Sequence, residues 1–257
     1  MPAKFKQTDN LGEIIIDNPP LNILDADMFA QLPVAVAQAA ASDIRALLIR
    51  AEGDDFSAGP DPSVFFGLDE TTAKGFAAQI LGFFQSIEAI AVPTVALIQG
   101  QCYAGALELC LACDIIWAAE GAHIGQVEAR GGGMPFGGGT QRIASRVGAA
   151  RAAEMVMTAP ILSGETLAAY GLVNRVLPKA DLAREGRALA QSLADGPTLA
   201  HMRTKRLIRA GRSGGVEAAD ALLPELGPAV ILSEDLQNGT RTLQSKGWSA
   251  VQTFHGR

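Results

Sequence analysis

Two glutamates, Glu108 and Glu128, stand where the surrounding residue types best suit acid–base chemistry. Glu108 lies three residues after Gly105, so on a helix the two share a face. The apolar β-type run 94–98 precedes that helix, and a strand-to-helix turn directs free backbone N–H groups at whatever lies above it. Glu128 follows a short turn and precedes the run GGGMPFGGG. Two carboxylates beside an anion-stabilising amide suit proton transfer next to a carbonyl group.

The motifs around these glutamates resemble those of the crotonase superfamily, and enoyl-CoA hydratases within it most closely. The matching motifs are FSAGPD (56–61), GQCYAGALEL (100–109), CDIIWAAEGAHIGQVE (113–128), PFGGGTQRI (135–143) and YGLVNRVLP (170–178). The likeness starts at DNPPLN (17–22), is dense from 94 to 178 and is weak after 190. The resemblance implies a lyase of fatty acid metabolism that adds water across the α,β double bond of an enoyl-CoA thioester.

The resemblance also implies a role for individual positions. Glu108 and Glu128 match the two catalytic glutamates, which hold the attacking water and share its protons. Gly105 and Pro60 match the two positions whose backbone forms the oxyanion hole. The matching substrate-binding residues are Leu21, Ile23, Ala58, Gly59, Asp61, Pro135, Phe136, Gly137 and Lys246, the last reaching a neighbouring subunit's CoA. Coenzyme A is then part of the substrate, and we expect no separate cofactor and no metal.

Pro60 departs from the pattern that the resemblance implies. Proline has no backbone N–H, so this half of the oxyanion hole lacks its donor. Losing one such donor typically costs about 10²–10³ in rate. Four interpretations stay open: the loop shifts so that Gly59 or Asp61 donates, Gly105 acts alone, the reaction is not ordinary hydration, or Pro60 only rigidifies a loop.

Two further functions are therefore alternatives to hydration. One is a sibling activity, enoyl-CoA isomerisation or dienoyl-CoA hydration. Retention of both glutamates argues against a simple isomerase, which needs one main base. The other is a catalytically impaired acyl-CoA-binding relative, in which Pro60 has disabled the oxyanion hole.

Composition and charge predict the class of protein and the compartment in which it works. The chain has 257 residues, 48% of them hydrophobic, and a net charge of −6. This charge predicts no general attraction to nucleic acid or to anionic membranes. The first ten residues contain no apolar signal core, and no apolar run reaches the about 18 residues of a membrane span. We expect a cytoplasmic protein.

The cysteines and the basic residues have ordinary structural interpretations. Cys110 and Cys113 form C-x-x-C, but no second pair follows, so the spacing predicts buried reduced thiols rather than a zinc site. A basic run near the C-terminus could meet phosphates, although such a run is more often a solvated helix face. It comprises His201, Arg203, Lys205, Arg206, Arg209 and Arg212.

Apolar periodicity predicts alternating strands and helices, hence an α/β fold. We expect strands at 13–16, 46–50, 94–98, 115–118 and 173–177, and helices at about 25–41, 71–90, 104–112, 139–147, 149–158 and 163–170. From 179 the chain reads as helical. The resemblance adds a crotonase-like spiral core of repeated ββα units at 1–190, and a helical region at 191–257 that assembles a homotrimer or a hexamer (dimer of trimers).

Overall fold

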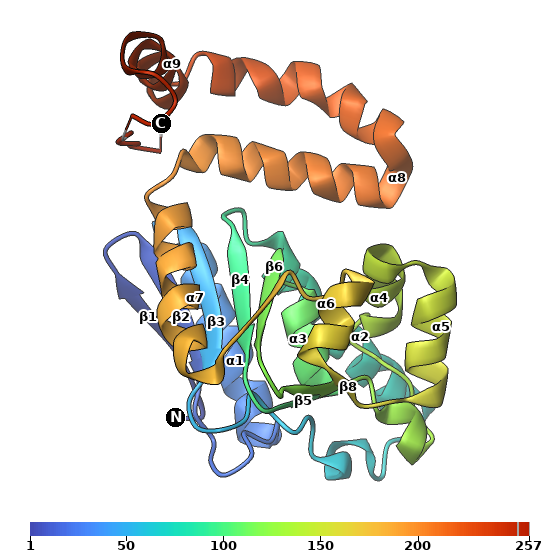
Figure 1. Ribbon diagram of the computed structural model, residues 1–257. Helices are drawn as coiled ribbons and strands as arrows, with labels where there is room; N and C mark the ends of the chain where they lie inside the picture. Colours follow the sequence, from blue (N-terminus) through green and yellow to red (C-terminus); the bar gives the residue numbers. More distant parts are fainter. Residues whose placement is uncertain (251, 257) are drawn as a thin grey trace.

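The chain forms a mixed β-sheet covered by helices, with a helical arm at one end of the sheet (Figure 1). The computed structural model describes residues 1–250 and 252–256. In spatial order the main sheet contains β1 (Ala3–Thr8), β2 (Leu11–Ile16), β3 (Ala46–Ala51), β4 (Thr94–Ile98), β6 (Ile115–Ala119) and β9 (Arg175–Leu177). β1 is antiparallel to β2, and the remaining neighbours are parallel.

The central strands are buried on both faces, which explains their continuous apolar sequences. Leu47 and Ile49 of β3 share one core with Met28 of α1 (Ala26–Ala41). Leu48, between them, belongs to a second core with Leu182 of α7 (Lys179–Ala194). Successive residues of a strand point to opposite faces, so α1 and α7 cover opposite sides of the sheet.

A smaller sheet lies beside the main one and carries the turns that lead to the two glutamates. Its strands are β5 (Gln101–Tyr103), β7 (His123–Gly125) and β8 (Leu162–Ser163). The helices around both sheets are α2 (Glu70–Ala89), α3 (Gly105–Leu111), α4 (Gly139–Val147), α5 (Ala149–Thr158) and α6 (Gly164–Tyr170), with the 3₁₀ turns η1 (Pro62–Phe65) and η2 (Glu128–Gly131).

The expected α/β architecture is confirmed, and the expected strands and helices are present. The sequence offers Asp25 or Asp27 as the cap of α1, and Asp25 is the one that caps it, through a hydrogen bond from the Met28 backbone N–H. The sequence did not predict β1, β5, β7 or β8. β1 alternates apolar and charged residues over only four positions, a strand signal that the sequence interpretation missed, and the other three strands have two or three residues each, too short for a periodicity.

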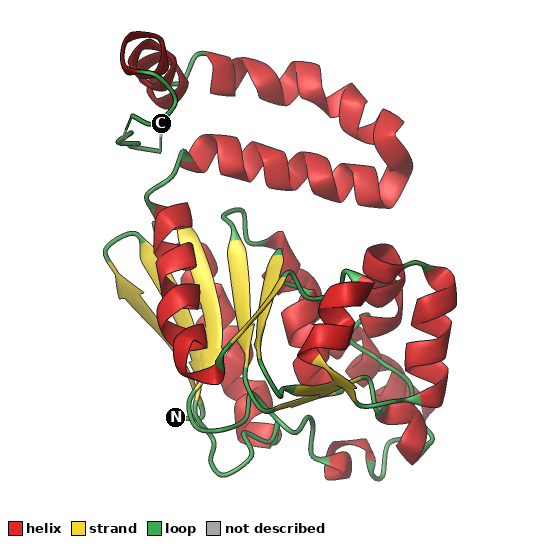
Figure 2. Cartoon of the chain, viewed as in Figure 1, coloured by secondary structure: helices red, strands yellow, loops and turns green. Residues whose placement is uncertain are grey.

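The C-terminal region is a helical arm, as expected. The chain leaves the sheet after α7, and the described residues that follow form helices and loops (Figure 2). α8 (Thr198–Ile231) turns back on itself at Gly215, where φ is 78°, and α9 (Glu234–Lys246) completes the arm. The proposed division at 190/191 falls inside α7. Among the described residues no helix is long and apolar enough to cross a membrane.

Candidate active site

Glu108 is a carboxylic acid enclosed by protein. It lies in α3, whose seven residues are all buried, and is 3% exposed. The turn before α3 is strained, because Ala104 adopts φ 52° and ψ −124°, a conformation that favours glycine. Such strain at a non-glycine residue is typical of functional sites. Here it orients the first residues of the helix that carries Glu108.

Glu128 approaches from a different element. It is the first residue of η2, and its Oε1 accepts a hydrogen bond of 2.6 Å from Nε2 of Gln126. Gln126 is 1% exposed. Among the described residues, Oε2 of Glu128 and Oε1 of Gln126 are buried without a partner. Buried polar atoms are normally hydrogen-bonded, so these two oxygens mark a place where a water or a ligand group fits.

Three consecutive glycines let the loop before α4 approach these side chains. A Cβ atom at Gly137 would lie 2.1 Å from the Phe84 ring and 2.9 Å from Oε2 of Glu108. At Gly139 it would lie 2.9 Å from Oε1 of Gln126 and 3.1 Å from Cγ of Glu108. The backbone N–H of Gly139 donates to Oε1 of Glu108 at 2.8 Å. The loop therefore closes over the acids because it lacks side chains.

This environment changes the acidity of both carboxyl groups. The pKa of Glu108 is raised to about 7, mainly by burial and also by the nearby charge of Glu128, while the amides of Gly139 and Gly137 and the charge of Arg142 lower it in part. Burial also raises the pKa of Glu128, while a hydrogen bond from its own backbone and one from the Gln126 side chain lower it in part. A carboxyl group with a pKa near 7 can both accept and release a proton at neutral pH.

A second segment runs alongside the end of the FSAG sequence (56–59). The backbone N–H of Ala58 donates to the carbonyl of Leu21 at 3.0 Å, and that of Leu24 donates to the carbonyl of Gly59 at 2.9 Å. Ile23 lies between these anchor points. The structure therefore brings the residues predicted to bind the CoA portion together, from two segments that are distant in sequence.

The backbone donors on either side of Pro60 are already used. The N–H of Gly59 donates to Oγ of Ser57 at 3.1 Å, and the N–H of Asp61 donates to the carbonyl of Leu24 at 3.1 Å. In this conformation neither neighbour has replaced the donor that Pro60 lacks.

Pro60 lies against Gly105, the other residue predicted to form the oxyanion hole. Pro60 pairs with Leu24 in a parallel bridge whose bonds use the flanking residues, so the nitrogen of Pro60 faces away from Leu24. A Cβ atom at Gly105 would lie 3.7 Å from Cδ of Pro60. A methylene group thus occupies the place of an amide hydrogen. Gly105 is the first residue of α3, where N–H groups have no partner within the helix.

Comparisons with known proteins identify the family of this chain. A sequence profile of the family described as Enoyl-CoA hydratase/isomerase matches residues 6–239. The chain belongs to the enoyl-CoA hydratase/isomerase family. It is 29% identical over 250 residues to the "Probable enoyl-CoA hydratase" of Rhodobacter capsulatus, covering 95% of each chain. It is 30% identical over 191 residues to a protein of the same description from Mycobacterium tuberculosis, covering 74% of each.

Solved structures of this family share the fold. An enoyl-CoA hydratase from Geobacillus kaustophilus superimposes with a TM-score of 0.92 at 26% identity, covering all of this chain and 97% of the other. This agreement extends through the helical C-terminal region and confirms the expected crotonase-like fold.

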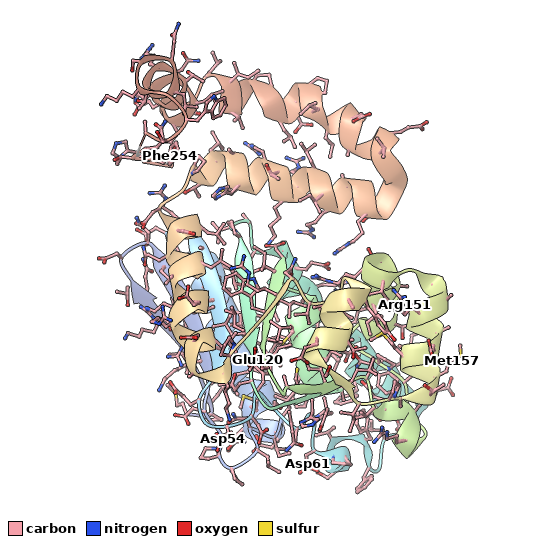
Figure 3. The ribbon with its side chains drawn as sticks, in the orientation of Figure 1. Asp54, Asp61, Glu120, Arg151, Met157 and Phe254 are labelled. Carbon is pink, nitrogen blue, oxygen red and sulfur yellow. The ribbon has the colours of Figure 1, made fainter. Side chains whose placement is uncertain are left out.

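The remaining predicted residues of this hydratase/isomerase chain divide into two groups. Pro135 is buried and Phe136 half-buried in the loop over the acids, where the Phe136 ring lies 5.8 Å from that of Phe65. Lys246 is exposed at the end of α9, at the far end of the molecule from the Asp61 loop; Figure 3 labels Asp61 and Phe254 at these two ends. Within one chain, Lys246 is not part of the site.

Sequence reasoning missed Gln126 and Arg142, which contact the acids and the glycine loop. Both lie in motifs that matched the superfamily, and their polar character beside so many small residues was an available signal. The interpretation of the basic run as a solvated face is wrong for Lys205, which is 7% exposed and pairs with Asp114 at 2.7 Å. The three cysteines are buried, as predicted.

Proposed function

We propose that this protein is an enoyl-CoA hydratase, a lyase that adds water across the α,β double bond of an enoyl-CoA thioester. The observation that carries the proposal is the buried pair Glu108 and Glu128, one with a pKa near 7 and the other with an unpaired buried oxygen. A mobile proton and a free acceptor next to a backbone amide are the requirements of this reaction.

In the proposed reaction both glutamates hold the attacking water. A water O–H bond breaks as the oxygen bonds to the β-carbon, and a carboxylate takes the proton. The electron pair of the double bond moves toward the thioester oxygen, and a carboxyl group then returns a proton to the α-carbon. Both additions occur from the side of the alkene that faces the glutamates, which predicts syn addition. The proton taken from water equals the proton returned to the α-carbon, so the reaction balances without a cofactor or a metal.

The negative charge that develops on the thioester oxygen needs a donor, and Gly105 N–H is the candidate. Pro60 faces the same place with Cδ. The pantetheine chain would run along the segment containing Leu21 and Ile23 and the Ala58–Asp61 loop. Pro135, Phe136 and Gly137 would line the acyl and water side.

Of the two alternatives, only one has an observation that favours it. Isomerisation or dienoyl-CoA hydration would use the same acids and amide, so the fold favours neither over hydration. A relative that binds acyl-CoA without turning it over is favoured by Pro60, since the N–H groups of Gly59 and Asp61 are both engaged.

We also propose assembly as a homotrimer or a dimer of trimers. Exposed apolar side chains gather on the arm: Ile208, Val216, Leu223, Ile231, Leu232 and Trp248. Burial of such residues against other subunits would remove apolar area from water. Lys246 could then reach a neighbouring subunit's CoA.

Turnover of crotonyl-CoA by the purified protein tests the proposal. Loss of the conjugated thioester absorbance, with incorporation of ¹⁸O from labelled water into the product, is the expected result. A shifted double bond without ¹⁸O would indicate isomerisation. Saturable binding without turnover of crotonyl-CoA or longer enoyl-CoA esters would favour the non-catalytic alternative.

A further inference from the structure

The helical arm is attached to the core through cationic side chains of α8. Nη1 of Arg209 donates to the backbone carbonyl of Glu88 at 2.7 Å, and Arg212 pairs with Oε1 of the same residue. Glu88 is at the C-terminal end of α2, and its side chain is 14% exposed. Two residues of the arm therefore converge on one residue of the core, Arg209 on its backbone carbonyl and Arg212 on its carboxylate.

The same carboxylate continues inward to the glycine loop. Oε2 of Glu88 accepts from Nη2 of Arg142 at 2.9 Å, and Nη1 of Arg142 donates to the carbonyl of Gly137 at 2.6 Å. Arg142 is 6% exposed, and its guanidinium lies against Gly138, where a Cβ atom would be 2.0 Å from Nη1.

The loop that Arg142 holds is the loop that contacts Glu108. Gly139, two residues beyond Gly137, donates its N–H to Oε1 of Glu108 at 2.8 Å. A continuous set of hydrogen bonds and ion pairs thus leads from Arg212 through Glu88 and Arg142 to the 137–139 loop and Glu108. The steps from Glu88 inward join groups that are mostly or fully buried, where such bonds are stronger than in water, whereas Arg212 lies at the exposed end of the set.

We propose that Arg142 and Glu88 are positioning residues that couple the docking of the C-terminal arm to the geometry of Glu108. Arg142 fixes the 137–139 loop, and Glu88 fixes Arg142 while holding Arg209 and Arg212. The inference rests on the proposed function only in taking Glu108 as catalytic. A small displacement of a catalytic group costs rate far more than binding, because the reaction depends on alignment.

Arg142 also acts on Glu108 through charge. It lowers the pKa of Glu108, whereas Glu128 raises it. Glu88 offsets part of the positive charge of Arg142, and Arg212 in turn offsets part of that of Glu88. Removing the charge of Arg142 therefore predicts a higher pKa for Glu108, in addition to any loss of alignment.

The test compares Arg142→Met with Arg146→Met. Arg146 lies on the same helix, one turn further, and donates to the carbonyls of Cys113 and Leu111, away from the loop. Infrared spectroscopy of the substrate-free, full-length protein follows the protonated carboxyl band that is absent in Glu108→Gln. In Arg142→Met this band should disappear at a higher pH than in wild type, and in Arg146→Met at the wild-type pH.

Kinetics on crotonyl-CoA give the second readout. Arg142→Met should lower kcat roughly tenfold or more while KM changes less than about threefold. Arg142→Lys keeps the charge but not both hydrogen bonds, so it should restore the infrared titration and only part of kcat. Arg212→Met and Glu88→Gln should also lower kcat, and the decrease should be smaller for Arg212→Met.

These outcomes separate the inference from the proposed function. The infrared titration needs no substrate, so it tests the effect of the Arg142 charge on Glu108 whether or not the protein is active. A wild type that hydrates no enoyl-CoA would overturn the proposed function but not this inference. An unchanged titration in Arg142→Met overturns the inference, as does an equal effect of Arg146→Met. If Arg142→Met does not fold, Arg142→Lys and Arg212→Met decide: parental kcat in both overturns the coupling.

Discussion

Replacing Pro60 by alanine would restore the backbone donor that this chain lacks. Pro60 is held in a bridge to Leu24 by bonds that use only Gly59 and Asp61. These bonds do not involve the nitrogen of residue 60, so they persist in Pro60→Ala. The new N–H would point where Cδ now lies, toward Gly105. The structure therefore predicts a second donor without rearrangement of the loop.

The expected gain follows from the value of one such donor. A single oxyanion-hole hydrogen bond contributes about 2.7–4 kcal/mol to the transition state, or about 10²–10³ in rate. Some of this is lost if the new amide is not optimally aligned, so we expect kcat to rise at least about tenfold. KM should change less, because the donor matters most as negative charge builds. Alanine also frees the unfolded chain, which should lower stability by about 0.4–1 kcal/mol.

The assay is hydration of crotonyl-CoA at saturating and limiting substrate, with circular dichroism to confirm the fold. Pro62→Ala is the matched control, because Pro62 is the next proline, opens η1 and lies outside the bridge. It should leave kcat near the parental value. Thermal unfolding of both variants separates the stability effect, which they share, from the catalytic effect, which only Pro60→Ala should show.

An unchanged or reduced kcat in folded Pro60→Ala would refute the missing-donor reasoning. It would mean that the loop adopts another conformation when substrate binds, freeing the N–H of Gly59 or Asp61, or that Gly105 alone suffices. A crystal structure with a bound acyl-CoA would then show which amides lie within about 2.7–3.1 Å of the thioester oxygen.

Four further predictions follow. Glu108→Gln and Glu128→Gln should each lower hydration by orders of magnitude with CoA-ester binding nearly intact; parental activity in either would refute its role. Because the pKa of Glu108 is raised to about 7 from 4.5, its ionisation destabilises the fold as pH rises through that window, by on the order of 3 kcal/mol at most. Glu108→Gln should therefore match wild type in thermal unfolding at pH 5 and exceed it at pH 8. Gly139→Ala should reduce kcat and stability together, since its Cβ would meet Gln126. Light scattering at micromolar concentration should give a trimer or hexamer mass, and a monomer would contradict the proposed assembly.

The sequence predicted the candidate site where chemistry depended on local spacing. Glu108 shares a helix with Gly105, so their relation follows from helical geometry alone. The run of glycines after Glu128 was noted in the sequence only for its position, and the close contacts at Gly137 and Gly139 come from the structure. The central strands were predictable because burial on both faces requires continuous apolar residues.

The rest depended on contacts between distant parts of the chain. Nothing local to Arg142 indicates that its partner is Glu88, which lies on another helix far earlier in the sequence. The basic run of α8 has the composition of a solvated face, yet Lys205 and Arg212 meet carboxylates of the core. The position of those carboxylates decides which face of a charged helix is buried. The periodicity of the helix sequence does not predict that position.

In the proposed reaction, the unusual features of the site act on one developing charge. A single amide at Gly105 leaves the thioester oxygen less stabilised than two would, so more of the charge must be removed by proton transfer to the α-carbon. That transfer is easiest from a group whose pKa lies near the working pH, and burial gives Glu108 such a pKa. The weak oxyanion site and the raised pKa are therefore complementary: a chain with Pro60 depends on accurate placement of Glu108, and hence on the loop that Arg142 holds.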